Sequence, residues 1–184
     1  MPLRVGAQRR RAAVDTVAHH QFDRHGQQVW RQAEAVLDAE RARHALGQVA
    51  VPYGTCQEPS NVQAGGGACP FRFRCVGCDH FHTDVSYLPD LTAYLQDLLR
   101  DREKILATGG LDDWARADAL PSEAEIGKVK DLIHRVRDHL DDLNDAERAD
   151  LDQAVTVVRR GRQLTHLGMP QIRPPRPDLR LERP

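Results

Sequence analysis

The chain has 184 residues, a length that suits one compact domain or two small ones. Its 26 Lys and Arg residues nearly balance its 27 Asp and Glu residues, so overall charge neither favours nor excludes a nucleic-acid partner. No apolar segment of a signal peptide follows the basic N-terminus, and no apolar run approaches the roughly twenty residues of a membrane helix. We therefore predict a cytoplasmic protein with no membrane partner, in a compartment where disulfide bonds are rare.

Residues 1–50 form the first predicted segment, and its apolar spacing is helical. One helix is expected over residues 9–24, followed by a turn in which Gly26 takes a positive φ. A second helix is expected over residues 27–47, with Gly47 at its C-terminal end.

Residues 51–87 form the second predicted segment, which prolines and glycines such as Pro52 and Pro70 interrupt throughout. The apolar run Val49-Ala50-Val51 is expected to be extended, because Pro52 disfavours the helical conformation at the residue before it. We expect no regular element in the rest of this segment, and a core too small to hold it together.

Helical spacing returns in the third segment, residues 88–166. A stripe of apolar residues spaced three and four apart predicts a helix that begins near Pro89, and a short segment with Trp114 as its apolar anchor follows. The positions of the stripe are Leu88, Leu91, Leu95, Leu98, Arg102 and Ile105, of which Arg102 alone is not apolar.

Two capping-box patterns, Ser122 with Glu125 and Asn144 with Glu147, open two further helices. We expect these to pair as an antiparallel hairpin over residues 122–165, with their apolar stripes packed in the core; a partner-binding coiled coil is the alternative. Residues 167–184 are rich in Pro and Arg and are expected to be a disordered tail. The predicted fold class is mainly α, with helical segments flanking a small irregular cysteine knuckle.

The four cysteines all lie in residues 51–87 with the spacing C-x12-C-x5-C-x2-C, at Cys56, Cys69, Cys75 and Cys78. Four cysteines clustered between breakers, with none elsewhere, predict a tetrahedral Zn²⁺ site with four sulfur ligands. An iron–sulfur cluster is the rival cofactor, and His80 or His82 are alternate ligands. A closed four-cysteine zinc site is structural, because it leaves no position for a reacting water.

Two arginines lie within the knuckle, in the run Phe71-Arg72-Phe73-Arg74. If the run is extended, Arg72 and Arg74 lie on one face and are candidate DNA phosphate contacts. The alternative is that both are solvated while the two phenylalanines cover the metal site.

No nucleophile elbow, phosphate loop, zinc-protease motif or dinucleotide fingerprint is present, and no small-molecule substrate is evident. We therefore predict that this chain has no catalytic residues and is not an enzyme.

Residues 12–160, and the string from Val51 to Leu99 above all, resemble the C-terminal cysteine-bearing extension of actinobacterial-type tyrosine site-specific recombinases of the transposon and phage integrase family. The resemblance is carried by Gly54, Cys56, Pro59, Cys69, Pro70, Cys75, Cys78, His80, Phe81, Thr83, Leu88 and Leu91. The catalytic domain of that family, with its Arg, Lys, His-x-x-Arg and nucleophilic Tyr, has no counterpart in this sequence.

The resemblance implies a non-catalytic accessory role in DNA recombination, integration or transposition, with DNA as a partner and a recombinase catalytic subunit or further protomers as others. A truncated integrase fragment is expected, since the catalytic part would precede Met1. A zinc-stapled helical protein-interaction module, an iron–sulfur protein and a remnant without function are the alternatives.

Overall fold

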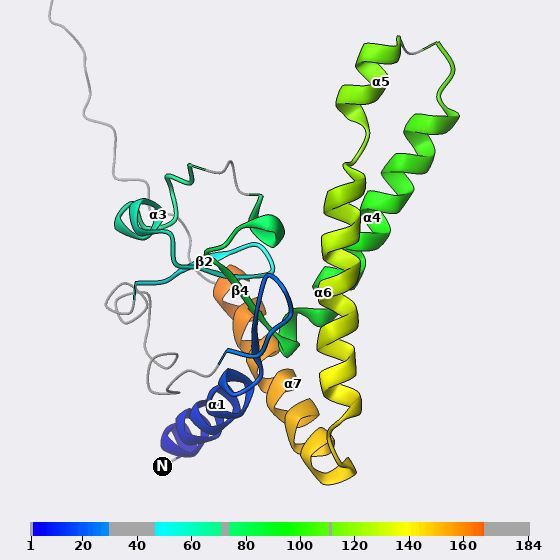
Figure 1. Ribbon diagram of the computed structural model, residues 1–184. Coiled ribbons are helices and arrows are strands. Elements are labelled where there is room, and N and C mark those ends of the chain that lie inside the picture. The colour runs from blue at the N-terminus through cyan, green and yellow to red at the C-terminus, as the bar shows by residue number, and fades with distance from the viewer. Residues whose placement is uncertain (1, 30–46, 71–73, 111, 168–184) are drawn as a thin grey trace, which may run out of the picture.

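The computed structural model describes residues 2–29, 47–70, 74–110 and 112–167. The described chain is mainly α, with one small four-stranded antiparallel sheet (Figure 1). Among these residues, no helix is both long and apolar enough to cross a membrane. The tail beyond residue 167, most of the helix expected over 27–47, and Arg72 lie outside the described residues.

The sheet has the strand order β1-β4-β3-β2, and every neighbouring pair is antiparallel. Its strands are β1 (Gln21–Asp23), β2 (Val49–Val51), β3 (Gly54–Cys56) and β4 (Phe81–Asp84). The extended run at Val49–Val51 is confirmed. The expectation of no regular element after it is wrong, because β3, β4, the short helix α3 (Pro59–Gln63) and two 3-10 turns lie there.

The first helix, α1, spans Pro2–Ala18 rather than residues 9–24. It stops early because the chain next enters β1, whose Gln21 pairs with Asp84 of β4. The turn predicted at Gly26 is present: its φ is 71°, and the Asp23 carboxylate accepts hydrogen bonds from the backbone N–H groups of His25 and Gln27 at 2.8 and 2.9 Å.

Four helices follow the sheet: α4 (Leu88–Ala107), α5 (Asp113–Ala119), α6 (Glu123–Asp141) and α7 (Asp145–Leu167). The predicted hairpin of the last two differs from the structure. Helix α6 packs antiparallel to α4, as the Arg102–Glu123 ion pair shows, while α7 packs against α1 (Figure 1). The apolar stripe of α6 therefore faces that of α4, and α7 diverges from the turn that connects it to α6.

One of the two predicted capping boxes forms in full. Asn144 accepts from the N–H groups of Ala146 and Glu147 at 3.0 Å, and Glu147 accepts from the N–H of Asn144 at 3.1 Å. Ser122 is the N-cap of α6, but its side chain makes no cap bond. The carboxylate of Glu125 instead accepts a 2.5 Å hydrogen bond from the Tyr94 hydroxyl.

A single main core joins the sheet to the helices, and a smaller cluster of Val49, Cys56 and Val62 lies beside it. The main core takes side chains from α1, β1, β4, α4, α6 and α7. Trp114 is not part of it, contrary to expectation, because 78% of its surface is exposed.

Candidate metal centre

Three different elements supply the four cysteines. Cys56 ends β3, Cys69 lies in the loop after α3, and Cys75 and Cys78 bracket a 3-10 turn that the 2.9 Å hydrogen bond from Cys78 N to Cys75 O closes. No disulfide bond links them. The sheet brings the first and last cysteines together, because Cys56 lies opposite Phe81 in the β3–β4 pair.

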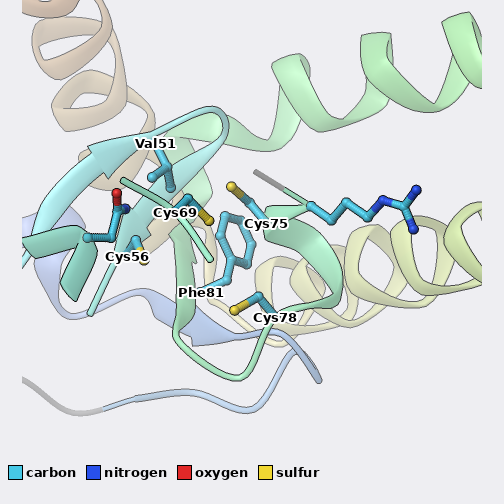
Figure 2. A pocket seen from close by; sticks show the side chains of 8 residues that line it. Val51, Cys56, Cys69, Cys75, Cys78 and Phe81 are labelled. Carbon is cyan, nitrogen blue, oxygen red and sulfur yellow. The ribbon is translucent and has the colours of Figure 1, made fainter. Parts of the chain in front are cut away.

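All four cysteines line one small cavity, together with Val51, Asn61, Arg74 and Phe81. Figure 2 shows the cysteine side chains gathered around the ring of Phe81. The cavity has room for about 10 Å³, which is the space of a single water molecule or ion. It is too small for an organic substrate or cofactor.

The cysteine side chains are not drawn together as tightly as metal ligands. In the described parts of the chain, no group of three or more His, Cys, Asp or Glu side chains has the arrangement that holds an ion. The structure thus gives the donor set and its shared cavity, but not a coordination geometry.

Electrostatics around Cys75 show why this donor set suits a cation. Burial, and after it the charges of the neighbouring Cys56, Cys69 and Cys78, raise the pKa of the Cys75 thiol to about 11. Thiolates that line one cavity repel one another, so they cannot all ionise without a positive charge among them. A bound Zn²⁺ supplies that charge and favours the thiolates outright.

Two polar groups beside the cysteines fit this chemistry. The backbone N–H of Glu58 donates to Cys56 Sγ at 3.4 Å, a bond that stabilises a thiolate. Asn61 is completely buried at the cavity wall, and neither of its amide atoms has a hydrogen-bond partner within the described residues. The donor set therefore fits a structural metal better than it fits a purely apolar core.

Neither alternate histidine lines the cavity. His82 is next to Phe81 on β4, and successive side chains of a strand face opposite sides of the sheet, so His82 faces away from the cysteines. His80 follows the Cys75–Cys78 turn and borders a second, outer hollow.

The outer hollow has room for about 290 Å³ and is lined by Arg74, Gly77, Cys78, Asp79, His80 and Lys128. Lys128 reaches it from α6, and its Nζ would lie 3.2 Å from a Cβ added at Gly77. The one carboxylate in the lining, Asp79, forms a 2.5 Å ion pair with Arg24. Because Arg74 and Lys128 also line the hollow, its net charge is positive.

Sequence reasoning found Arg74 but missed Lys128 and Asn61. Lys128 joins the hollow through the packing of α6 on the Cys75–Cys78 turn, and no local pattern signals that contact. Asn61 lies five residues after Cys56 in a stretch of breakers, and a polar residue there is unremarkable until its burial is known.

Comparison with family models, curated proteins and solved structures gave no match for this chain.

Proposed function

We propose that this chain is a non-catalytic DNA-binding accessory module of site-specific recombination, held together by one zinc ion at its four cysteines. The observation that carries the proposal is the Cys75–Cys78 turn, which borders both the ion-sized cavity and the positively charged outer hollow. Zinc would fix this turn and would thereby keep Arg74 at the outer hollow, which Lys128 also lines.

Several properties of the outer hollow support a phosphate contact. It is open to a ligand of phosphate size, and in the part of the chain that the structure describes neither Arg74 nor Lys128 forms an ion pair. Two cations at one concavity attract an oxyanion more strongly than either alone. The resemblance to recombinase extensions is the reason for choosing duplex DNA as the source of that phosphate.

The metal part of the proposal is tested by elemental analysis and visible absorbance of anaerobically purified protein. We expect about one zinc per chain and no colour. Iron with sulfide and a brown colour would replace zinc with an iron–sulfur cluster. Absence of both metals would remove the staple from the proposal.

The DNA part is tested by fluorescence anisotropy of a labelled duplex over a series of NaCl concentrations. Arg74→Gln and Lys128→Gln should each weaken binding and lower the slope of log K against log[NaCl] by about 0.9, the value for one lost phosphate contact. Lys130→Gln is the matched control, because Lys130 is exposed on the same helix but does not line the hollow. Equal slopes in all three variants would contradict the proposed contact.

A protein-interaction module is the second candidate, and the far end of the α4–α6 pair favours it. Trp114 and Leu106 are 78% and 55% exposed there, on α5 and at the end of α4 (Figure 1). Trp is one of the residue types that most often anchor a protein interface, so its exposure here favours a docking role. Light scattering should then show an assembly of the wild-type protein that Trp114→Ala disrupts. Neither the wild type nor the variant should bind DNA in the anisotropy experiment.

A further inference from the structure

Asn61 is a buried polar residue that the fold itself does not satisfy. Its side chain lines the cysteine cavity, it is 0% exposed, and both Oδ1 and Nδ2 lack a hydrogen-bond partner among the residues described. Most buried polar side-chain atoms in proteins have a partner. An amide with two orphaned atoms at one cavity wall therefore calls for an explanation.

The backbone around Asn61 holds its side chain in this position. The backbone N–H of Asn61 donates to the Glu58 carboxylate at 2.6 Å, and its backbone carbonyl oxygen accepts a hydrogen bond from Gly66 N at 2.8 Å. The next residue, Val62, is buried against Cys56 and Val49. The amide cannot turn out to solvent unless the short helix α3 leaves the small core.

Burying an amide without a partner costs about 1–3 kcal/mol, so an apolar residue of similar shape would suit the metal-free cavity better. A negative charge beside the amide would offset this cost, because it would accept a hydrogen bond from the amide N–H. Four thiolates around a divalent cation carry a net charge of about −2, and N–H donors stabilise such a cluster. Glu58 N already donates to Cys56 Sγ, and a side-chain N–H at the cavity wall would add a further donor to the cluster.

We infer that Asn61 is a positioning residue of the metal centre, whose side-chain N–H donates to a cysteine thiolate when the ion is bound. The inference rests on the proposed zinc site and adds a residue to it. The Nδ2 group turns towards sulfur because Oδ1, which carries negative partial charge, is repelled by a thiolate. The amide thus favours the charged, metal-bound state over the metal-free one.

The test compares Asn61→Leu and Asn61→Asp with Thr83→Val as the matched control. Thr83 is also a buried polar residue, but its hydroxyl has a partner, donating to Tyr53 O at 2.7 Å, and it does not line the cavity. Zinc affinity is measured by competition with a chelator, and the stability of the metal-free proteins by urea unfolding. The thiolate-to-metal charge-transfer band of the Co²⁺-substituted proteins reports the sulfur environment directly.

We expect Asn61→Leu to lower zinc affinity about 10- to 100-fold, the usual effect of losing a group that supports a metal ligand. The same variant should leave metal-free stability unchanged or raised, a pattern that a merely structural residue does not give. Asn61→Asp should lower affinity at least as much, because it places a negative charge beside thiolates. Thr83→Val should lower stability with or without zinc and leave the affinity unchanged.

Three results would overturn the inference. Wild-type zinc affinity and an unmoved Co²⁺ band in Asn61→Leu would do so while leaving the zinc site intact. If Asn61→Leu fails to fold, an unchanged affinity and band in Asn61→Asp would have the same meaning. Failure of the wild-type protein to bind zinc would remove the proposed metal centre and the inference with it.

Discussion

Residues 54–84 and residues 88–167 adjoin in the chain, yet their buried side chains differ in kind. Helix α6 alone buries Ile126, Val129, Leu132, Ile133 and Val136, and the last four of these lie in the main core. The cysteine-bearing region also sends Phe81 and Val76 into that core, but what lies beneath its own surface is a small cluster, a cavity lined by four thiols and an unsatisfied amide.

The difference indicates two sources of stability in one structure. Apolar burial supplies about 25 cal/mol per Å² and suffices where long helices present continuous stripes. Strands of three or four residues cannot present such stripes. A region of this kind needs another source of folding energy, and metal binding is one that its residues suit. Four predictions probe this contrast, from the largest expected effect to the smallest.

Removing the metal should affect the two regions unequally. On the order of 10 kcal/mol of binding free energy would be withdrawn from the cysteine region. Hydrogen exchange should then become much faster at amides such as Gln57, which donates to His80 O at 3.0 Å. Amides in α6 should change little, because apolar packing protects them. Exchange of the zinc-loaded and chelated proteins, read by mass spectrometry, gives the comparison, and a uniform change across both regions would contradict it.

The helical core should be sensitive to a single cavity. Leu132 is 1% exposed on α6, so Leu132→Ala should lower the free energy of unfolding by about 2–5 kcal/mol. Leu106→Ala is the matched control, because that leucine is largely exposed, and its effect should stay within about 0.5 kcal/mol. Urea unfolding measures both, and similar losses would mean that the core of α6 is not what stabilises this region.

The same contrast explains which elements could be predicted from the sequence. The helices that start at Glu123 and Asp145 were placed within a residue, because caps and apolar spacing are local signals. Their packing partners were not, since nothing local says whether α6 meets α7 or α4. The sheet has no local signal, because Gln21 of β1 pairs with Asp84 of β4 far along the chain and each strand is too short for an alternating pattern to be recognised.

The candidate site divides in the same way. The four cysteines can be recognised in the sequence by residue type alone, and the structure brings them to one cavity. Asn61 and Lys128 have ordinary residue types, and their places depend on burial and on the packing of α6. Sequence therefore predicts the donors of such a site more readily than the groups that support them.

A half-buried ionic contact ties α7 to the junction of the two regions. Arg162 lies 3.6 Å from the Asp84 carboxylate and over the ring of Tyr87, while Arg159 forms a bidentate pair with Asp90. Burial raises the pKa of Asp84, so its charge opposes folding at neutral pH and Arg162 offsets part of that cost.

Arg162→Gln should therefore lower the free energy of unfolding by about 2 kcal/mol near pH 7. The loss should shrink as the pH falls towards the raised pKa of Asp84, because protonation removes the uncompensated charge. Arg160→Gln, at an exposed neighbouring position, should have little effect at either pH. Thermal unfolding at both pH values measures the difference, and a loss that does not depend on pH would assign the role of Arg162 to its stacking on Tyr87.

The smallest expected effect lies at His20, where the chain between α1 and β1 meets the end of α6. Its Nδ1 is 2.8 Å from Nε2 of His139, whose ring packs edge-on against Phe22. Burial, followed by the charges of His139 and His19, lowers the pKa of His20 below 6.5, and Glu147 opposes this shift. Below that value unfolded His20 binds a proton that the folded protein resists, so stability falls as the pH drops.

His20→Gln should flatten this loss of stability between about pH 7 and about pH 5, while costing about 1 kcal/mol or less at higher pH through the lost hydrogen bond. His134→Gln is the control, because His134 is exposed and pairs only with Asp138 of its own helix among the ion pairs described. Urea unfolding across this range gives the slope of stability against pH. A slope that His134→Gln changes as much as His20→Gln would locate the pH dependence outside the His20–His139 contact, and the end of α6 would then be held by apolar packing as the rest of the helix is.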